Sequence, residues 1–295
     1  MKRLVRTVRD MGSQARGIIE VARRYYRRHG HIPNPCRPTT FHDKVALRIM
    51  FDRRPLLAVA ADKIAARAYA GERLGDSVLP KLYCVTGDPE EIPFDALPER
   101  FVVKPSHLSG QVQVVTDKSA LDRRALLERC RAWLRTNYYW RNLEWAYRNI
   151  TPRILVEEFI DNGSGAAPPD YKFFVFDGAV EMIQVDTNRF TGHRRSLYDR
   201  HWNRLPVRYC YDPIAEDGAR RPPHFEALCA AAQTLGRGVD FLRADFYDTD
   251  RQFYFGEITM TPGAAMERFS PEEFDHQLGT AWKMPPLVRI LRGRG

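Results

Sequence analysis

The second half of the chain contains two pairs of β-rich runs, and each pair is joined by a tight turn sequence. The first pair is residues 171–176 and 180–185 around Asp177-Gly178, and the second is residues 241–247 and 252–258 around residues 248–250. An Asp-Gly dipeptide between apolar runs is typical of a two-residue β-hairpin. The sequence therefore predicts antiparallel hairpins in this half, and they constrain the fold more than any other feature.

The first half of the chain has a different character, because helical periodicity dominates it up to residue 98. Short β-rich runs then appear at residues 101–104, 112–116 and 154–160, with one helix between them. We therefore predict an α+β chain. Its expected parts are a basic amphipathic helix (1–32), a mainly helical N-terminal region (33–98), a small α+β lobe (99–160), a large lobe (161–288) and a basic tail (289–295).

The positive charge of the chain lies at its two ends. The formal net charge is +9, but residues 1–31 hold nine Lys or Arg against two acids, and residues 289–295 hold three Arg. The body between them is close to neutral, whereas nucleic-acid-binding proteins carry basic patches and stacking aromatics over the body, so we expect no nucleic-acid partner.

The cysteines and the hydropathy of the chain indicate in which cellular compartment the protein is expected. The five cysteines are widely spaced and form no CxxC motif, which favours reduced thiols over a zinc site or a disulfide framework. No stretch reaches the roughly 18 consecutive apolar residues that a membrane-spanning helix needs. We expect a cytoplasmic protein.

Residues 1–31 predict one basic amphipathic helix. Its apolar positions recur at steps of three and four: Leu4, Val8, Met11, Ala15, Ile18, Ala22 and Tyr25. Such a helix either packs on its own domain with a solvated arginine face, or binds an anionic membrane surface. The sequence leaves both open, and the second would place the protein peripherally on the inner membrane face.

Two acidic residues of the second hairpin are candidates for a metal site. Asp245 and Glu257 lie on its two strands, so we expect them to stand opposite each other with their carboxylates on one face. Two carboxylates together with phosphate oxygens are how proteins hold Mg²⁺. The alternative is two solvated strand acids. It is weakened because Glu257 interrupts an otherwise apolar strand.

A lysine at a strand end is a candidate for phosphate binding. Lys104 closes an apolar run and is followed at once by a turn of small and polar residues, 105–110. A cation beside backbone N–H groups of a flexible turn suits phosphate oxygens. The alternative is a surface lysine on an edge strand.

Five motifs follow one another along the chain: Asp62-Lys63, Phe101-Val102-Val103-Lys104, Ile154 to Ile160, Arg243-x-Asp245, and Glu257-x-Thr259-x-x-Pro262-Gly263. This ordered set resembles the ATP-grasp enzymes and, more narrowly, the TupA-like ATP-grasp family, which is associated with cell-surface polysaccharide and teichuronopeptide biosynthesis. Further stretches that resemble the family are Asn137-Tyr138-Tyr139, Glu144-Trp145-x-Tyr147, Pro169 to Phe174, and Gln184 to Phe190. The resemblance covers residues 33–282. It implies an ATP-grasp fold, with two α+β lobes that enclose ATP and a helical N-terminal extension.

The resemblance also implies roles for individual residues. ATP phosphates would be bound by Lys63, Lys104, Ser109 and Gly110, adenine by the backbone of the hinge Glu157, Glu158, Phe159 and Ile160, and the ribose by Asp170. Mg²⁺ would be held by Asp245, Glu257 and Thr259. The catalytic residues would be Lys104, Arg243 and Lys172, and Lys172 would also bind the cofactor by facing the phosphates or the acyl group. Our candidates for an anionic acceptor are Arg189, His193 and Arg194, whose alternative is a solvated basic loop. Two positions depart from the family pattern: Leu108 in the phosphate loop, and Thr259 where many ATP-grasp enzymes have an asparagine.

The expected activity is an ATP-dependent ligase that joins a carboxylate to an amine through an acyl phosphate, acting on small-molecule or glycan substrates in surface polysaccharide assembly. The expected cofactors are ATP and Mg²⁺. Two alternatives stay open at this point. One is a kinase of the same fold that phosphorylates a sugar or lipid hydroxyl, and the other is a non-catalytic, nucleotide-binding scaffold.

Overall fold

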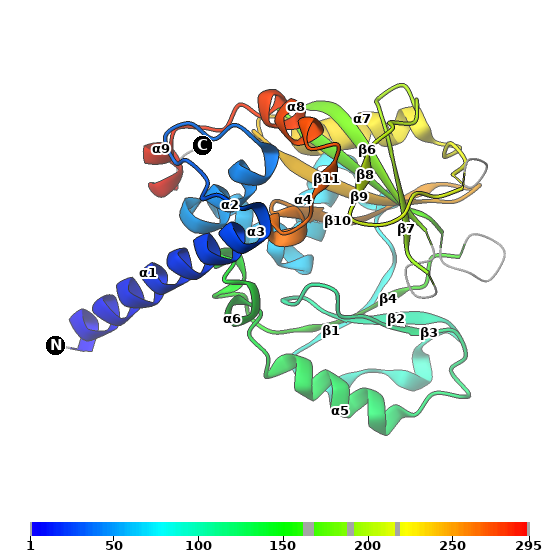
Figure 1. The fold of residues 1–295 in the computed structure, drawn as a ribbon. Helices are drawn as coiled ribbons and strands as arrows, with labels where there is room; N and C mark the ends of the chain where they lie inside the picture. The colour runs from blue at the N-terminus through cyan, green and yellow to red at the C-terminus, as the bar shows by residue number, and fades with distance from the viewer. Residues whose placement is uncertain (1, 162–167, 188–191, 216–218, 294–295) are drawn as a thin grey trace.

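The computed structural model describes residues 2–161, 168–187, 192–215 and 219–293 (Figure 1). The helices are α1 (Lys2–His29), α2 (Phe41–Phe51), α3 (Pro55–Ala61), α4 (Lys63–Leu74), α5 (Arg123–Leu134), α6 (Tyr139–Asn142), α7 (Phe225–Gly236), α8 (Glu273–Ala281) and α9 (Leu287–Leu291). The 3₁₀ turns are η1 (Asp76–Val78), η2 (Pro89–Glu91), η3 (Phe94–Ala96), η4 (Trp145–Tyr147) and η5 (Pro262–Ala265). The strands are β1 (Leu82–Thr86), β2 (Phe101–Pro105), β3 (Gln113–Val115), β4 (Ile154–Glu158), β5 (Asp170–Phe176), β6 (Ala179–Thr187), β7 (Arg194–Tyr198), β8 (Arg208–Tyr209), β9 (Leu242–Asp248), β10 (Phe253–Thr259) and β11 (Phe269–Ser270).

The large lobe is built on an antiparallel sheet with the strand order β10-β9-β5-β6-β7. Both predicted hairpins are confirmed, as β5–β6 and β9–β10. The first turns at Asp177-Gly178, where both residues have positive φ angles of 49° and 81°, as the tight turn requires. Helices α4 and α7 cover one face of the sheet, and α2 and α8 cover the other (Figure 1).

One face of this sheet is apolar at one end and charged at the other. Alternate residues of a strand share a face, so Lys172 lies on the same face of β5 as Phe174 and Phe176. The two phenylalanines pack into the core beneath α2 and α8, whereas Lys172 pairs with acidic groups. The charged end of this face therefore forms a buried polar site beside the hydrophobic core.

The small lobe is a second antiparallel sheet, with the order β1-β4-β2-β3, packed against α5. The prediction of helix through residue 98 is wrong for β1, which pairs with β4 about seventy residues later in the chain. Tyr83, Val85 and Thr86 favour a strand, but five residues are too short to show a period. Ile92 and Phe94 also join the small-lobe core.

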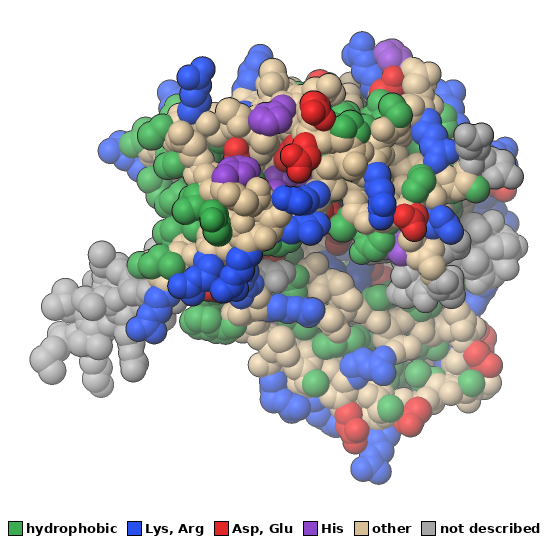
Figure 2. All heavy atoms as spheres, viewed as in Figure 1, with side chains coloured by type: hydrophobic (Ala, Val, Ile, Leu, Met, Phe, Trp, Pro, Cys, Tyr) green, Lys and Arg blue, Asp and Glu red, His purple; other side chains and the backbone are tan. Residues whose placement is uncertain are grey.

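The second half of helix α1 packs on the body. Val21 and Tyr25 are 4% and 0% exposed, and the Tyr25 hydroxyl donates to Asp43 Oδ1 at 2.9 Å. The first half of α1 runs away from the body (Figure 1). Figure 2 shows Lys and Arg side chains gathered near the base of this helix, where Arg23 and Arg27 are exposed. Within the described ranges, no helix combines the length and apolarity needed to cross a membrane.

Candidate active site

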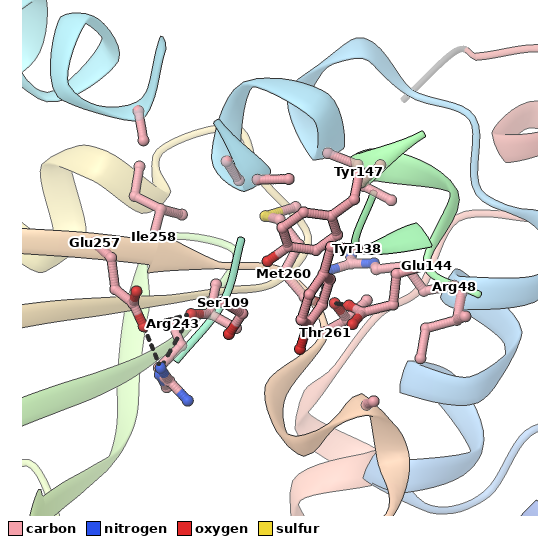
Figure 3. A pocket seen from close by; sticks show the side chains of 18 of the residues that line it. Arg48, Ser109, Tyr138, Glu144, Tyr147, Arg243, Glu257, Ile258, Met260 and Thr261 are labelled. Atoms are coloured by element: carbon pink, nitrogen blue, oxygen red, sulfur yellow. Dashed lines mark hydrogen bonds and ion pairs between the residues drawn. The ribbon is translucent and has the colours of Figure 1, made fainter. Parts of the chain in front are cut away.

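A cavity of about 430 Å³ lies where the helical N-terminal region, the small-lobe loop at residue 109, η4 and the end of β10 meet (Figure 3). Its volume falls in the range of small-molecule sites. Five of the predicted site residues line it: Lys63, Ser109, Arg243, Glu257 and Thr259. The predicted residues Lys104, Gly110, the hinge 157–160, Asp170, Lys172 and Asp245 are not among its lining residues.

A β-bulge at Gly256 sets the register of the two carboxylates. Phe255 pairs with Phe246, but the bulge then brings Glu257, rather than Gly256, opposite Asp245. A Cβ atom on residue 256 would lie 3.0 Å from the Asp245 carbonyl oxygen, so glycine suits the bulge. The prediction that Asp245 and Glu257 stand opposite each other is confirmed.

The guanidinium of Arg243 joins these carboxylates. Its Nε and one terminal nitrogen donate to the two Asp245 oxygens at 2.7 and 2.6 Å. The same terminal nitrogen lies 3.0 Å from Glu257 Oε1 and 3.0 Å from Thr259 Oγ1 (Figure 3). Oxygens of Asp245, Glu257 and Thr259 therefore converge on one cationic nitrogen.

This convergence tests whether the residues fit a magnesium ion. Oxygen donors from two carboxylates and a hydroxyl already surround a positive charge. Across the described part of the chain, no cluster of three or more His, Cys, Asp or Glu side chains is arranged to hold a metal. Mg²⁺ in nucleotide sites commonly uses one or two carboxylates together with phosphates and waters. The donor set fits that mode.

Lys172 supports Asp245 from the neighbouring strand. The β5–β9 register places the two residues opposite each other. Lys172 Nζ lies 2.7 Å from Asp245 Oδ2 and also pairs with Asp170, and all three residues are at most 3% exposed. Burial raises the pKa of Asp245 to about 6, although the attraction of Arg243 and Lys172 opposes this shift. In this arrangement Lys172 holds Asp245 in place.

The loop at residues 106–110 is tied to α4 by Lys63. The backbone N–H of Lys63 donates to the Ser106 carbonyl at 3.1 Å, and its ammonium donates to the Leu108 carbonyl. The Leu108 side chain is 2% exposed in the small-lobe core. Burial lowers the pKa of Lys63 to about 8. Leu108, a departure from the family pattern, therefore anchors this loop.

Comparison with known proteins identifies the family. The sequence profile described as TupA-like ATP-grasp matches residues 43–283. The chain belongs to the TupA-like ATP-grasp family. The family prediction is thereby confirmed, and the chain takes its place among the ATP-grasp enzymes. No functionally curated protein matches it in sequence.

Solved structures resemble this TupA-like chain at low sequence identity. The ATP-grasp ligase PsnB, complexed with a minimal precursor, is 13% identical with a TM-score of 0.43, over 77% of this chain and 62% of PsnB. D-alanine–D-alanine ligase from Bacillus anthracis, complexed with ATP, is 16% identical with a TM-score of 0.45, over 81% and 69% of the two chains. N5-carboxyaminoimidazole ribonucleotide synthetase from Thermus thermophilus is 14% identical with a TM-score of 0.40, over 70% and 47%. The TupA-like chain thus spans less than two thirds of PsnB and of the synthetase.

Half of the predicted adenine hinge, residues 157–160, lies within strand β4. Strand β4 lies between β1 and β2, and the backbone of Glu157 is in register with both neighbours. The carboxylate of Glu157 pairs with Lys104 Nζ at 2.5 Å. Glu158 is the last residue of β4, so only Phe159 and Ile160 lie beyond the strand. The backbones of Glu157 and Glu158 are therefore paired within the sheet, and the adenine-binding role of residues 157–160 stays a prediction.

Two of the three predicted acceptor residues, His193 and Arg194, fall within the described residues. Arg189 lies outside the described residues. The His193 ring lies 3.8 Å from the Tyr211 ring, centroid to centroid, and its Nε2 is 3.2 Å from Asp186 Oδ1. Arg194 is exposed and donates to a backbone carbonyl at 3.3 Å. Neither His193 nor Arg194 lines the cavity.

A neighbouring arginine that sequence reasoning missed is buried instead. Arg195 is 6% exposed and donates to Asp186 at 2.7 Å and to Glu267 at 3.2 Å. On β7, Arg194 is exposed, whereas Arg195 and the three residues after it are buried. The sequence carries three consecutive polar residues here, 194–196, and no period showed that the last two are buried.

Sequence reasoning also missed much of the cavity wall. The additional polar and aromatic lining residues are Arg48, Asp52, Tyr138, Glu144, Trp145, Tyr147 and Thr261. Four of them belong to the two family-like stretches at 137–139 and 144–147, so the resemblance marked them without giving them roles. The stretch 135–150 folds mostly into short turns, which leaves no periodic pattern to show which side chains face inward.

Proposed function

We propose that this TupA-like chain is an ATP-dependent carboxylate–amine ligase that forms an amide through an acyl phosphate. The observation that carries the proposal is the convergence of Asp245, Glu257 and Thr259 around Arg243. Three of these four residues line the cavity together with Lys63, whereas Asp245 is buried and is not part of the lining. A cation site, two cationic side chains and a small-molecule cavity together suit phosphoryl transfer to a substrate held there.

The chemistry needs no protein nucleophile. ATP phosphorylates the substrate carboxylate, and an amine then attacks the acyl phosphate to give an amide and free phosphate. Lys63, Lys104 and the Ser109-Gly110 turn bind phosphate oxygens, and Arg243 stabilises the charge on the transferring group. Mg²⁺, held by Asp245, Glu257 and Thr259, would supply neutralisation of the phosphate charge when bound.

The proposed substrate is a sugar acid or an amino acid that is joined during cell-surface glycan assembly. The test is ADP release with Mg·ATP across a panel of uronic acids and amino acids, each paired with amine acceptors. We expect carboxylate-dependent ADP release and an amide with free phosphate. A stable phosphoester product would instead identify the kinase alternative. No carboxylate-dependent release across the panel would contradict ligase chemistry.

The lowered pKa of Lys63 predicts a pH dependence of nucleotide binding. Lys63 carries its charge only below its pKa, which is about 8. ATP phosphates favour the charged form, so affinity is lost once the free protein deprotonates above that value. We expect the Kd for Mg·ATP, measured by calorimetry, to rise roughly tenfold from pH 7 to pH 9.

The matched variant for this experiment is Lys63→Arg, because arginine keeps its charge across the range. Its Kd should stay level from pH 7 to pH 9. An equal rise of the Kd in both proteins would show that Lys63 does not bind the ATP phosphates.

We further propose that the first half of α1 attaches the protein to an anionic membrane surface. It projects from the body (Figure 1), whereas the packed residues Val21 and Tyr25 lie in the second half. Deleting residues 2–14 should abolish co-sedimentation with phosphatidylglycerol vesicles at low salt and leave the melting temperature unchanged.

A comparison variant separates attachment from packing. Tyr25→Ala should keep vesicle binding but lower the unfolding free energy by about 3–5 kcal/mol, because a fully buried ring is lost. Undiminished vesicle binding after deletion of residues 2–14 would refute the membrane role of this segment.

A further inference from the structure

One end of the cavity is built around a buried acid to which the proposed reaction has so far given no part. Glu144 is 7% exposed, and its carboxylate accepts a hydrogen bond from the Thr261 hydroxyl. In Figure 3 these two residues lie with Tyr138, on the opposite side of the view from Arg243 and Glu257. The cavity therefore has a Glu144 end and an Arg243 end.

The Glu144 carboxylate does not serve its own helical turn. Glu144 is the N-cap residue of η4, but its side chain makes no capping hydrogen bond there. It reaches instead to Thr261, which follows β10 far along the chain. Both residues line the cavity. The carboxylate is thus directed to the cavity wall rather than to local structure.

A cationic residue, Arg48, lies beside Glu144 in Figure 3. Arg48 also lines the cavity, but its guanidinium bonds Asp240 at 2.6 Å and the Phe241 carbonyl at 2.9 Å, and lies 4.4 Å from the Trp282 ring. Its charge is therefore directed into the core. A buried carboxylate facing a cavity attracts a cation and repels an anion.

Two tyrosine rings complete this end. The ring centroids of Tyr138 and Tyr147 lie 4.6 Å apart, and both residues line the cavity. Burial, together with the charge of Glu144, raises the pKa of both phenols, so they stay neutral. Each hydroxyl also interacts with Ser109 of the phosphate loop. Aromatic faces beside a carboxylate suit an ammonium group.

We propose that the Glu144 end is the acceptor subsite and that it takes a substrate carrying a protonated primary amine. This inference rests on the proposed ligase function. The donor carboxylate and its acyl phosphate, which are anionic, occupy the Arg243 end. Glu144, Tyr138 and Tyr147 hold the ammonium group and select the amine over an uncharged acceptor.

The proton balance of the step follows from this placement. The bound ammonium gives one proton to Glu144, and the free amine attacks the acyl-phosphate carbonyl. The new C–N bond forms as the C–O bond to phosphate breaks, and the phosphate leaves with that electron pair. The second proton lost from nitrogen leaves with the phosphate, and Glu144 releases its own proton to solvent.

The test separates acyl-phosphate formation from amine capture. Hydroxylamine, which is small and uncharged at pH 7.5, traps acyl phosphates as hydroxamates without needing an ammonium subsite. With a carboxylate that gives hydroxamate in the wild type, glycinamide, ethanolamine and 1,4-diaminobutane serve as amine probes. In Glu144→Gln we expect the KM of the productive amine to rise at least 20-fold, the KM of ATP to change less than twofold, and the amide-to-hydroxamate ratio to fall at least 20-fold.

The matched control is Glu181→Gln, an exposed glutamate on β6, which should behave as the wild type. Equal losses of amide and hydroxamate in Glu144→Gln, or an unchanged KM for the amine, would overturn the subsite. If the wild type forms no hydroxamate with any carboxylate, the ligase proposal itself fails, and the subsite fails with it.

A second pair of variants covers the case in which Glu144→Gln does not fold. Tyr147→Phe keeps the aromatic ring, and Tyr147→Leu removes it. Loss of a cation–π contact of about 1 kcal/mol corresponds to roughly fivefold, so the KM of the amine should rise about fivefold in Tyr147→Leu and stay near the wild-type value in Tyr147→Phe. Equal values in the two variants would contradict an ammonium site.

Discussion

Replacing Glu257 with glutamine is expected to lower Mg·ATP-dependent ADP release by about 10²–10³-fold while leaving the fold intact. The Glu257 side chain is 45% exposed, so the loss of its charge costs little stability. It nevertheless supplies one of the oxygens that converge on the cation position beside Arg243. Steady-state ADP release and a thermal melt of the same sample measure the two effects.

The control for this experiment is Glu181→Gln, which makes the same chemical change at an exposed position of β6. If Glu257→Gln releases ADP at the wild-type rate, Glu257 is not a metal ligand. Function retained in cells by both Asp245→Asn and Glu257→Gln would favour the non-catalytic scaffold over an enzyme.

Replacing Lys172 with methionine is expected to lower the unfolding free energy by about 3–5 kcal/mol, because it leaves buried carboxylates without their cation. Lys172 pairs with both Asp170 and Asp245, and the three side chains are at most 4% exposed. Arg243 still pairs with Asp245 in this variant. Urea denaturation at pH 8 measures the change.

Two further measurements identify the cause of that loss. The double variant Asp170→Asn/Lys172→Met should recover part of the stability, because one buried charge is removed with the cation. A carboxylate left without its cation has a raised pKa in the folded state, so its penalty applies above that pKa and shrinks as the pH falls. The destabilisation should therefore be smaller at pH 5 than at pH 8. A pH-independent loss would point to packing rather than charge.

The part of the large-lobe site that lies on hairpin strands could be predicted from the sequence. The turn chemistry at Asp177-Gly178 and the spacing of Asp245 and Glu257 predicted the hairpins and the facing carboxylates, because hairpin pairing is local. The one-residue bulge at Gly256 was not predicted, yet it decides that Glu257 rather than Gly256 stands opposite Asp245. The contact of Lys172 with Asp245 joins strands about seventy residues apart, so no local pattern contains it.

The cavity wall was the least predictable part of the site. Arg48, Glu144 and Thr261 come from α2, the turn η4 and the loop after β10. Each looks like an ordinary polar residue in its own segment. They line one space only after the helical region and the large lobe have packed together. The wrong expectation at β1 has the same origin, because its partner β4 lies far away in the sequence.

The sequence by itself determined the α+β class, the large-lobe hairpins and the TupA-like ATP-grasp family, because these depend on local turn chemistry, strand alternation and the order of motifs. It also located the positive charge at the two ends of the chain. Only the tertiary structure decided that the second half of α1 packs on the body, where Lys172 and Arg243 direct their charges, and that Glu144 faces a cavity. Those outcomes depend on burial and on contacts between distant segments, which a one-dimensional pattern does not contain.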